Sequence, residues 1–415
     1  MYMNKYVRQI FFACLLIGFF LISCEPTGNV ISVEKNDLFD MEYGNFEENI
    51  NLFSLSSPGP VSTKIEMYDG FFYIANGESK KVMEMNSYGD LISVYYNAET
   101  NPTPSFVTSN SSKINQQNEE SIHTAVEYPF NELGDIAVDE RKYLYVVDRL
   151  PIERQEVDEN SRVVLSQVVL RFDSNGTFID YIGQQGPGGV PFPYIKNIYT
   201  TSKNELVVVC QTNTGMTVFW FNETGYLLYT VPFEIESLPN PMQDTTELEM
   251  FVSLEKIVPS FTEHKLFVKL DYYVTTVDTA TNVQSGIDYM ATLLYPLELD
   301  VGVYGHPLNI PAYDQTVTDG FSKLVYPMSY EFLGVTESGW LFFMIAEEEG
   351  YSIQMIQESG QKIIKRHLNI DHSSYLYHAF DFSSDGILSG LFAQEDKAVM
   401  SWWRTDTLID SIING

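Results

Sequence analysis

One stretch of the sequence indicates the fold: Gly134-Asp-Ile-Ala-Val-Asp139, followed by Leu144-Tyr-Val-Val-Asp148 and Leu170-Arg-Phe-Asp-Ser-Asn-Gly-Thr-Phe178. Each segment contains a short apolar run, and the last one carries Asp-Ser-Asn-Gly between two such runs. Short apolar runs bounded by Gly, Asn and Asp favour antiparallel strands joined by tight turns. The stretch therefore predicts one small antiparallel sheet.

The same order of strand, turn, strand, loop, strand, glycine turn and strand recurs along the chain. Copies begin at Lys64, Gly134, Asn197, Phe332 and Ala379, and a degenerate copy covers Glu255 to Val303. A sheet that repeats in this way is typical of a β-propeller, in which each copy forms one blade. We therefore predict an all-β fold with six blades of four antiparallel strands and long loop inserts, and a seventh blade is left open.

The repeated unit resembles NHL-type propeller repeats. The second copy is the most similar, and it leads into Ile182-Gly-Gln-Gln-Gly-Pro-Gly-Gly-Val-Pro-Phe-Pro-Tyr194, which looks like the family's inter-blade connection. The resemblance is good over residues 61–230, weak over 231–330 and moderate over 331–410. It implies a propeller fold but no single activity, because such propellers include lyases, lactonases and protein-binding scaffolds.

The N-terminus has the features of a secretory signal. Lys5 and Arg8 precede an apolar run from Ile10 to Ile22, which is shorter than the roughly 20 residues of a membrane span. Leu21-Ile-Ser23-Cys24 resembles the lipobox of bacterial lipoproteins. The resemblance implies cleavage between Ser23 and Cys24 and attachment of acyl chains such as palmitate to Cys24. A plain signal peptide or an anchor helix is the alternative.

These segments predict three regions of the chain and its cellular location. Residues 1–23 are a signal peptide, residues 24–49 are the acylated Cys24 with an acidic tether, and residues 50–415 are the propeller domain. Asn51 to Leu55 are a candidate returning strand for the last blade. The expected location is outside the cytoplasm, anchored through lipidated Cys24 to the inner or outer membrane of a bacterium, and the layout is similar to lipoproteins of spirochaetes.

The charge of the chain excludes one class of function. The sequence has 56 Asp and Glu against 24 Lys and Arg, a formal net charge of -32, which is the opposite of a nucleic-acid binder. A hydrophobic content of 44% and an aromatic content of 14% indicate a folded body. Net negative charge is concentrated between Asn204 and Ser322, where 16 acidic residues are accompanied by only three lysines. A cationic partner or divalent ions are one interpretation of this surface, and a solvated surface is the other.

Candidate chemical groups are few. The sequence lacks a phosphate-binding loop, a His-Glu-x-x-His motif, a Cys-x-x-Cys pair and a Gly-x-Ser-x-Gly motif. His367, His372 and His378 are clustered in one inter-blade link, which favours locally bonded imidazoles over a three-His metal site drawn from several blades. Asp173 to Asp180 lacks the twelfth-position Glu of a calcium loop and is interpreted as a tight turn. Cys210 ends an apolar run and is expected to be a buried thiol.

No catalytic residue, metal site or cofactor is therefore predicted. The favoured function is a membrane-anchored binding or assembly module, and the alternatives are a metal-dependent hydrolase or lyase at the propeller channel and a structural spacer in the cell envelope. Several inserts provide a possible surface for a protein partner, and Trp402 and Trp403 are expected to pack between blades. The inserts are Asn97 to Glu127, Pro151 to Arg162, Pro232 to Leu254 and Thr275 to Gly286.

Overall fold

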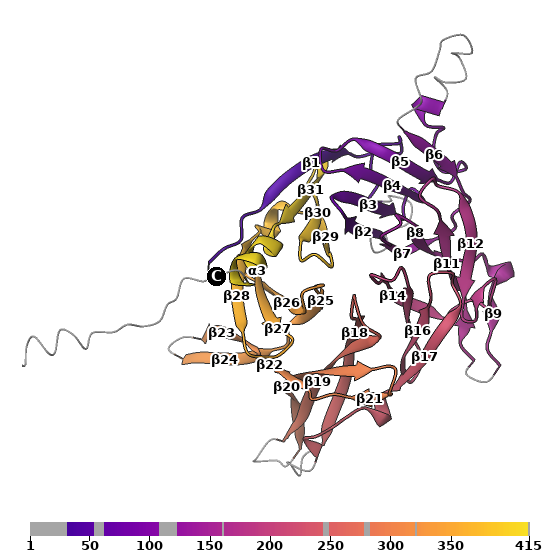
Figure 1. Cartoon of the computed structure of the whole chain (residues 1–415). Coiled ribbons are helices and arrows are strands. Elements are labelled where there is room, and N and C mark those ends of the chain that lie inside the picture. Colours follow the sequence, from indigo (N-terminus) through magenta and orange to yellow (C-terminus); the bar gives the residue numbers. More distant parts are fainter. Residues whose placement is uncertain are drawn as a thin grey trace, which may run out of the picture.

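Six β-sheets stand in a ring around a central channel (Figure 1). The structure is a computed structural model that describes residues 31–53, 62–107, 123–159, 162–243, 249–277, 283–319 and 322–413. Within these ranges the chain is an all-β propeller with six blades, as the repeats predict, and the seven-blade alternative is wrong. The predicted signal peptide and Cys24 lie outside the described residues.

Blades 1 to 3 follow one another along the chain, and the first strand of each blade lies beside the channel. Later strands pair outward in antiparallel order, except that the last strand of blade 1 is parallel to its neighbour. Blade 1 contains β2 (Thr63–Tyr68), β3 (Phe71–Asn76), β4 (Lys81–Asn86), β5 (Leu91–Tyr96) and β6 (Thr124–Glu127). Blade 2 contains β7 (Leu133–Val138), β8 (Leu144–Arg149), β11 (Gln167–Phe172), β12 (Phe178–Gly183) and β13 (Gly186–Pro187). Blade 3 contains β14 (Tyr194–Thr200), β15 (Leu206–Gln211), β16 (Gly215–Phe221) and β17 (Leu227–Glu234).

Blades 4 to 6 complete the ring. Blade 4 contains β18 (Met250–Pro259), β19 (Lys265–Val277), β20 (Gln284–Glu298), β21 (Val303–Tyr304) and β22 (Leu308–Ile310). Blade 5 contains β25 (Glu331–Val335), β26 (Trp340–Glu347), β27 (Gly350–Gln357) and β28 (Ile363–Asn369). Blade 6 contains β29 (Tyr377–Phe382), β30 (Leu388–Ala393), β31 (Lys397–Trp403) and β1 (Asn36–Glu42). The other elements are η1 (Ile152–Arg154), β9 (Glu156–Val157), β10 (Val164–Leu165), η2 (Ile235–Ser237), β23 (Tyr313–Asp319), β24 (Ser322–Met328), η4 (His372–Ser374) and α3 (Thr405–Ile413).

Strand β1 closes the ring, because it pairs antiparallel with β31 and thereby joins the N-terminal part of the chain to the last blade. Phe39 and Met41 are buried on one side of β1, while the Asp40 carboxylate lies 2.6 Å from the Lys397 ammonium. Residues 36–42 thus belong to the propeller and not to a tether over residues 24–49. The closing strand is also not Asn51 to Leu55, of which the described residues form no strand.

The tight turns are built as the repeats predict. In the turn between β11 and β12, the Asp173 N–H donates to the Thr177 carbonyl at 2.9 Å. The Asp173 carboxylate accepts the N–H groups of Asn175 and Thr177 at 2.9 and 2.8 Å. Gly176 has a φ of +81°, a conformation that glycine adopts without strain. The segment is a tight turn, which confirms the interpretation that favoured a turn over a calcium loop.

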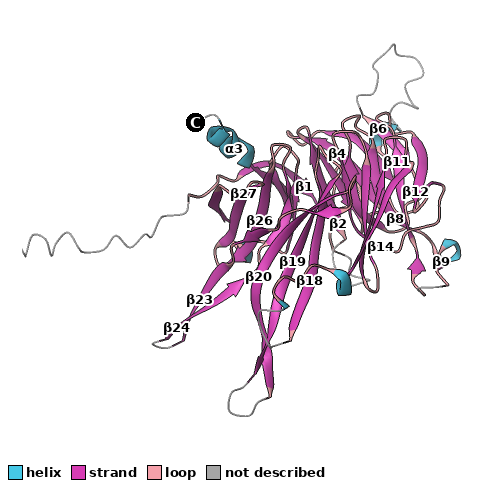
Figure 2. Cartoon of the chain, turned by 60° about the horizontal axis from the view of Figure 1, so that its bottom comes forward, coloured by secondary structure: helices cyan, strands magenta, loops and turns pink. Residues whose placement is uncertain are grey.

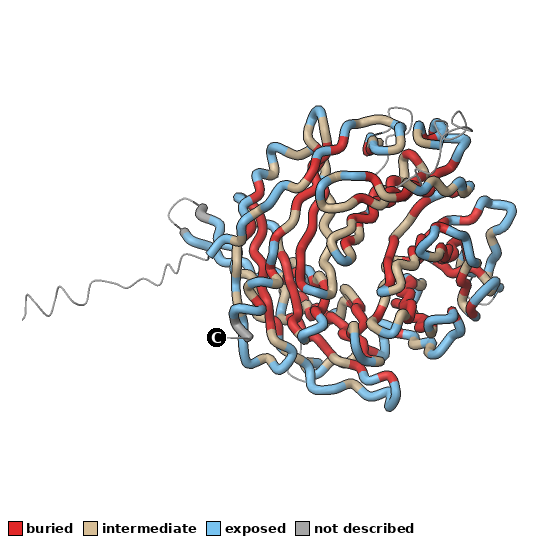
Figure 3. The backbone as a smooth tube through the Cα atoms, turned by 45° about the horizontal axis from the view of Figure 1, so that its top comes forward, coloured by how far each residue is buried: buried red, intermediate tan, exposed pale blue. Residues whose placement is uncertain are grey.

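Apolar side chains fill the space between neighbouring blades. Most buried residues lie on the strands, and the connecting loops are largely exposed (Figure 3). Between blades 2 and 3, for example, Val147 packs in one cluster with Val208 and Phe221. Cys210 lies in the same cluster and is fully buried, so burial raises the pKa of its thiol and the expectation of a buried thiol is confirmed. Trp403 is fully buried between blades 5 and 6, as expected.

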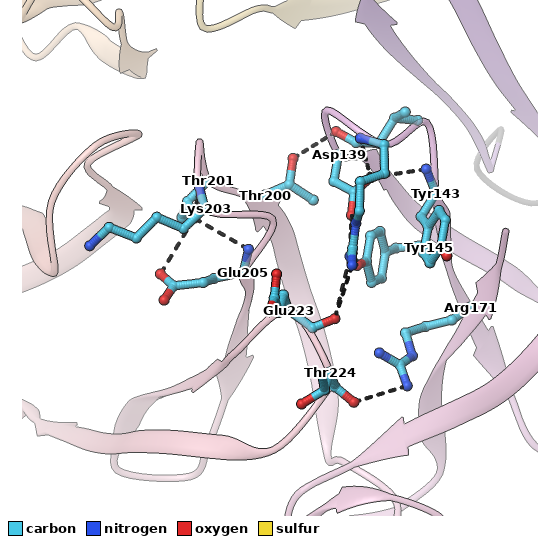
Figure 4. A network of polar contacts seen from close by, with 12 residues as sticks. Asp139, Tyr143, Tyr145, Arg171, Thr200, Thr201, Lys203, Glu205, Glu223 and Thr224 are labelled. Carbon is cyan, nitrogen blue, oxygen red and sulfur yellow. Dashed lines mark hydrogen bonds and ion pairs between the residues drawn. The ribbon is translucent and has the colours of Figure 1, made fainter. Parts of the chain in front are cut away.

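A buried carboxylate also joins blade 2 to blade 3 (Figure 4). Asp139 accepts the N–H groups of Arg141 and Tyr143 at 2.9 and 3.0 Å and the Tyr145 hydroxyl at 3.1 Å. The Arg141 guanidinium donates to Asp139 at 2.6 Å and reaches the Glu223 carbonyl of blade 3 at 3.3 Å. Because the Asp139 side chain has no exposed surface, the position of this turn depends on the ion pair.

Two pairs of strands extend beyond the ring on one side (Figure 2). They are β19 with β20 and β23 with β24. The first pair contains the predicted insert Thr275 to Gly286 as a hairpin, of which residues 278–282 are outside the described ranges. Among the described residues, no helix has both the length and the apolar character needed to cross a membrane.

Candidate functional site in the central channel

The inner strands of all six blades surround a cavity of about 460 Å³. Its walls come from β2, β7, β14, β18, β25 and β29, together with the turns that follow several of these strands. A cavity of this size is within the range of small-molecule sites, which hold a few polar groups at fixed positions. The polar side chains on these six strands therefore define the candidate site.

β-Bulges bring polar groups to the channel. The register of the inner strand shifts in blades 2, 3, 4 and 5, between Leu133 and Ile136 in blade 2 and between Ile195 and Asn197 in blade 3. The shifts in blades 4 and 5 lie between Leu254 and Lys256 and between Phe332 and Gly334. A bulge changes the direction of a side chain and leaves backbone groups without a ladder partner. Charged side chains can then lie on strands whose other residues are apolar.

Two lysines bond to backbone carbonyls that the bulges expose. Lys196 of blade 3 donates to the Glu255 carbonyl of blade 4 at 2.8 Å, and Lys256 of blade 4 donates to the Leu333 carbonyl of blade 5 at 3.2 Å. Burial lowers the pKa of both ammonium groups, and the nearby carboxylates of Glu331 and Asp135 partly offset this effect at Lys256. Each lysine thus joins its own blade to the next one around the channel.

Two carboxylates make the complementary contact with backbone N–H groups. Asp135 of blade 2 accepts the Ile198 N–H of blade 3 at 3.0 Å, and Asp381 of blade 6 accepts the Met67 N–H of blade 1 at 2.8 Å. Burial raises the pKa of Asp135, and its neighbours Lys64 and Ile198 act in the opposite direction. These contacts have a structural role, since they fix the inner strands relative to one another, and they also place carboxyl groups inside the cavity.

Glu66 of β2 and Asp381 of β29 form a hydrogen-bonded carboxyl pair. Burial raises the pKa of Glu66 well above its usual range, and the charges of Asp381 and Asp135 raise it further. Burial also raises the pKa of Asp381 to about 7. Two carboxyl groups in such contact retain one proton between them near neutral pH. The protonated Glu66 carboxyl then donates to the Asp381 carboxylate, while both side chains keep partial access to the cavity.

Tyr199 adds an unused hydrogen-bonding group to the same wall. Its hydroxyl is buried and has no hydrogen-bond partner among the residues that the structure describes. Burial raises the pKa of this phenol, and the charge of Asp135 adds to the effect. A buried donor without a partner costs about 1 to 3 kcal/mol, so a ligand that bonds to this hydroxyl gains a preformed contact.

Together these side chains supply the groups of an acid–base site. Glu66 holds a proton, Asp381 is a base near neutral pH, Lys256 is a partly buried amine whose pKa burial lowers, and Tyr199 is a hydrogen-bond donor. Strongly shifted pKa values in a cavity are typical of functional sites, although networks that hold strands together produce them as well. The arrangement can bind a polar ligand and transfer a proton to or from it.

The histidines are bonded locally, as the sequence predicts. His378 lies at the channel wall, where the Tyr351 hydroxyl is 2.6 Å from its Nε2 atom, and burial followed by the nearby His372 lowers its pKa. His372 contacts the Gly350 carbonyl at 3.0 Å, and His367 lies 2.9 Å from Glu347. In the described part of the chain, no three His, Cys, Asp or Glu side chains are placed to share one metal ion.

The sequence did not single out the channel residues, although a signal was present. In the repeats that begin at Lys64, Gly134 and Ala379, an acidic residue interrupts the innermost apolar strand, giving Glu66, Asp135 and Asp381. An acid at that place in three blades points toward the axis of a propeller, where six inner strands meet. That these three acidic side chains meet in one channel becomes visible only in the closed ring of six blades.

Comparison with known proteins finds only remote structural similarity. No protein-family model matches the chain, and no curated protein sequence matches it. Among solved structures, a gluconolactonase from Xanthomonas campestris is 10% identical with a TM-score of 0.38, over 91% of this chain and 99% of that one. A polysaccharide lyase acting on ulvan is 10% identical with a TM-score of 0.40, over 89% of this chain and 83% of that one. The same lyase bound to an oligosaccharide gives a TM-score of 0.38.

Proposed function

We propose that the propeller channel binds a small polar molecule and performs acid–base chemistry on it, in a protein that is exported and held on a membrane. The observation that carries this proposal is the Glu66–Asp381 pair, in which two hydrogen-bonded carboxyl groups from different blades line a cavity of about 460 Å³. A group that titrates near neutral pH transfers protons efficiently, and enzymes obtain such groups by burying paired carboxyls.

Each channel residue has a definite role in this proposal. Glu66 donates its proton to a ligand oxygen or nitrogen, and Asp381 accepts a proton from the ligand. Lys256 stabilises negative charge that develops on the ligand, and the Tyr199 hydroxyl orients it. Because the walls offer donors, acceptors and both signs of charge, the ligand class that fits best is a polyhydroxylated molecule with a carboxyl or carbonyl group.

Ligand binding tests the proposal directly. The purified protein is titrated calorimetrically with neutral sugars, sugar acids and their lactones at pH 7, and any turnover is followed as a function of pH. We expect at least one compound of this class to bind, and Glu66→Gln and Asp381→Asn to weaken binding or turnover at least tenfold. Asp288→Asn is the control, since Asp288 is exposed on β20 far from the channel. Equal binding by all three variants, or no binding by the wild type, would contradict the proposal.

The cellular location is a separate part of the proposal and rests on the sequence. Cleavage after Ser23 and acylation of Cys24 would anchor the protein to a bacterial membrane, and several acyl chains together give stable attachment. The NHL-type character of the repeats and the similarity to spirochaete lipoproteins belong to the same proposal. Cys24→Ala should move the protein from the detergent phase to the aqueous phase in a partition assay, and retention in detergent would refute the anchor.

A binding or assembly module is the second candidate function. The observation that favours it is the pair of extensions β19–β20 and β23–β24, which carry exposed apolar side chains on one side of the ring. A metal-dependent hydrolase or lyase would need a ligand set that the described residues do not bring together. A structural spacer would give the carboxyl pair no role. We therefore rank the metal-dependent enzyme and the structural spacer below the acid–base site in the channel.

A further inference from the structure

Strands β23 and β24 form a two-stranded extension with one apolar face, which we call the apolar ribbon. The cross-strand pairs Val317 with Leu324, Gln315 with Tyr326 and Tyr313 with Met328 are each two residues apart along the strands. Because side chains alternate between the two faces of a strand, all three pairs lie on the same face. The exposed fractions on this face are 43% for Val317, 43% for Leu324, 50% for Tyr326 and 39% for Met328.

The apolar ribbon is unusual for a surface element. In the described residues its two strands pair with each other and with no further strand. Contiguous apolar side chains on a surface mark contact with a protein or a membrane. Exposed apolar side chains also occur on the neighbouring hairpin, since Val283 just before β20 and Ile287 and Met290 on β20 are 62%, 56% and 42% exposed, and β20 contacts β24. Both extensions leave the ring on the same side (Figure 2).

The N-terminal segment enters the propeller beside the root of this ribbon. The Val33 N–H donates to the His367 carbonyl at 2.9 Å, and the His367 N–H donates to the Ile31 carbonyl at 3.3 Å. The His367 imidazole lies 2.9 Å from the Glu347 carboxylate, which is hydrogen-bonded to Tyr313 at the start of β23. A short series of contacts therefore links the first described residues to the ribbon.

Chain length then limits how far the ribbon can lie from residue 24. Only residues 25–30 separate Cys24 from Ile31, so the two are at most about 25 Å apart, at up to ~3.6 Å per residue. Strands of seven residues are about 24 Å long, so the ribbon extends over a similar distance. An acyl chain on Cys24 and the apolar face of the ribbon can thus reach the same lipid surface.

We propose that the apolar ribbon docks on the lipid bilayer to which Cys24 is anchored, an inference that rests on the proposed acylation. The ribbon suits a zwitterionic surface, because Asp314, Asp319 and Lys323 are its only charged residues, in a chain with a net charge of -32. Tyr326 has the apolar ring and polar hydroxyl that favour the interface between lipid and water. A second copy of the chain is disfavoured as the occupant, since two bodies of the same high charge repel each other.

A depth-sensitive fluorophore tests this docking. The acylated full-length protein carrying Leu324→Cys is labelled with an environment-sensitive dye and placed in phosphatidylcholine vesicles. In the acylated protein Cys14 has been removed with the signal peptide, Cys24 is acylated and Cys210 is buried, so the dye reacts at position 324. The matched control is Tyr88→Cys, since Tyr88 is 85% exposed in the β4–β5 turn of blade 1. We expect a blue shift and severalfold quenching by spin-labelled lipid at position 324 and neither effect at position 88.

Each alternative result has a distinct meaning. Equal quenching at positions 324 and 88, or quenching at neither, while the protein floats with the vesicles would overturn the docking and leave the anchor intact. A blue shift that grows with protein concentration and needs no lipid would assign the ribbon to a second copy and overturn the docking. Failure of the wild-type protein to float, with Cys24→Ala behaving identically, would refute the anchor and the docking together. Anionic phosphatidylglycerol in the vesicles should reduce the quenching at position 324.

Discussion

Replacing Asp381 with Asn should change how the stability of the propeller depends on pH. The folded protein raises the pKa of Asp381 from 3.8 to about 7, chiefly by burial. Between these values the folded state retains a proton that the unfolded chain has lost. The stabilisation is therefore complete below pH 3.8 and is lost as the pH rises through 7. Asparagine is neutral at every pH and can still accept the Met67 N–H, so Asp381→Asn removes this loss.

The magnitude follows from the same pKa values. At about 1.36 kcal/mol per pH unit, the change from 3.8 to about 7 corresponds to ~4 kcal/mol for an isolated group. The partial access of Asp381 to the channel and its contact with Glu66 reduce this figure. We expect Asp381→Asn to be more stable than the wild type by about 2 to 4 kcal/mol at pH 8 and nearly equal to it at pH 4.

Urea unfolding at pH 4, 6 and 8, followed by tryptophan fluorescence, provides the measurement. The wild-type midpoint should fall with rising pH more steeply than that of Asp381→Asn, whereas Asp288→Asn should follow the wild type. Parallel midpoints for the wild type and Asp381→Asn over the whole range would refute the reasoning, because they would mean that Asp381 titrates alike in the folded and unfolded states.

Three further predictions concern the frame of the propeller. Burial lowers the pKa of the Lys81 ammonium group from 10.5 to about 8, so the free energy of unfolding of the wild type should rise as the pH rises from 8 to 10.5. In urea unfolding, Lys81→Met should abolish this rise and increase the free energy of unfolding at pH 7 by about 1 to 3 kcal/mol. Asp139→Ala removes the buried acceptor of the Arg141, Tyr143 and Tyr145 donors and should cost about 1 to 3 kcal/mol, and an unchanged stability would contradict this. A chain that begins at residue 43 lacks β1 and exposes the edge of β31, so it should aggregate in size-exclusion chromatography, whereas a chain that begins at residue 31 should remain monomeric.

The blades were predictable because each one is a local pattern. Strands and turns near Gly134, Asn197 and Phe332 depend on residues that are close in sequence, such as Asp173 and Gly176 in the turn between β11 and β12. The closing strand was missed because it pairs with a segment more than 350 residues away, and Asn36 to Glu42 has only two buried apolar residues among its acids. The composition of residues 36–42 is that of a tether, and this segment forms a strand because it pairs with the free edge of β31.

The channel site could be predicted only in part. An acid on an apolar inner strand is visible in the sequence, as at Asp135 and Asp381, but its partners come from other blades. The contact of Glu66 with Asp381 joins residues that are 315 positions apart (381 minus 66), and no local pattern indicates that they meet. The bulge at Asp135 also depends on pairing within blade 2 and leaves no distinct sequence signature.

Infrared spectroscopy of the carboxyl groups tests the central claim most directly. The wild-type protein should retain a protonated carboxyl group at pH 8, because burial and the charges of Asp381 and Asp135 raise the pKa of Glu66. The C=O band of this protonated group should be present at pH 8 in the wild type and in Asp288→Asn, and absent in Glu66→Gln. A wild-type spectrum in which every carboxyl group is already ionised at pH 6 would contradict the proton-sharing pair and the acid–base site built on it.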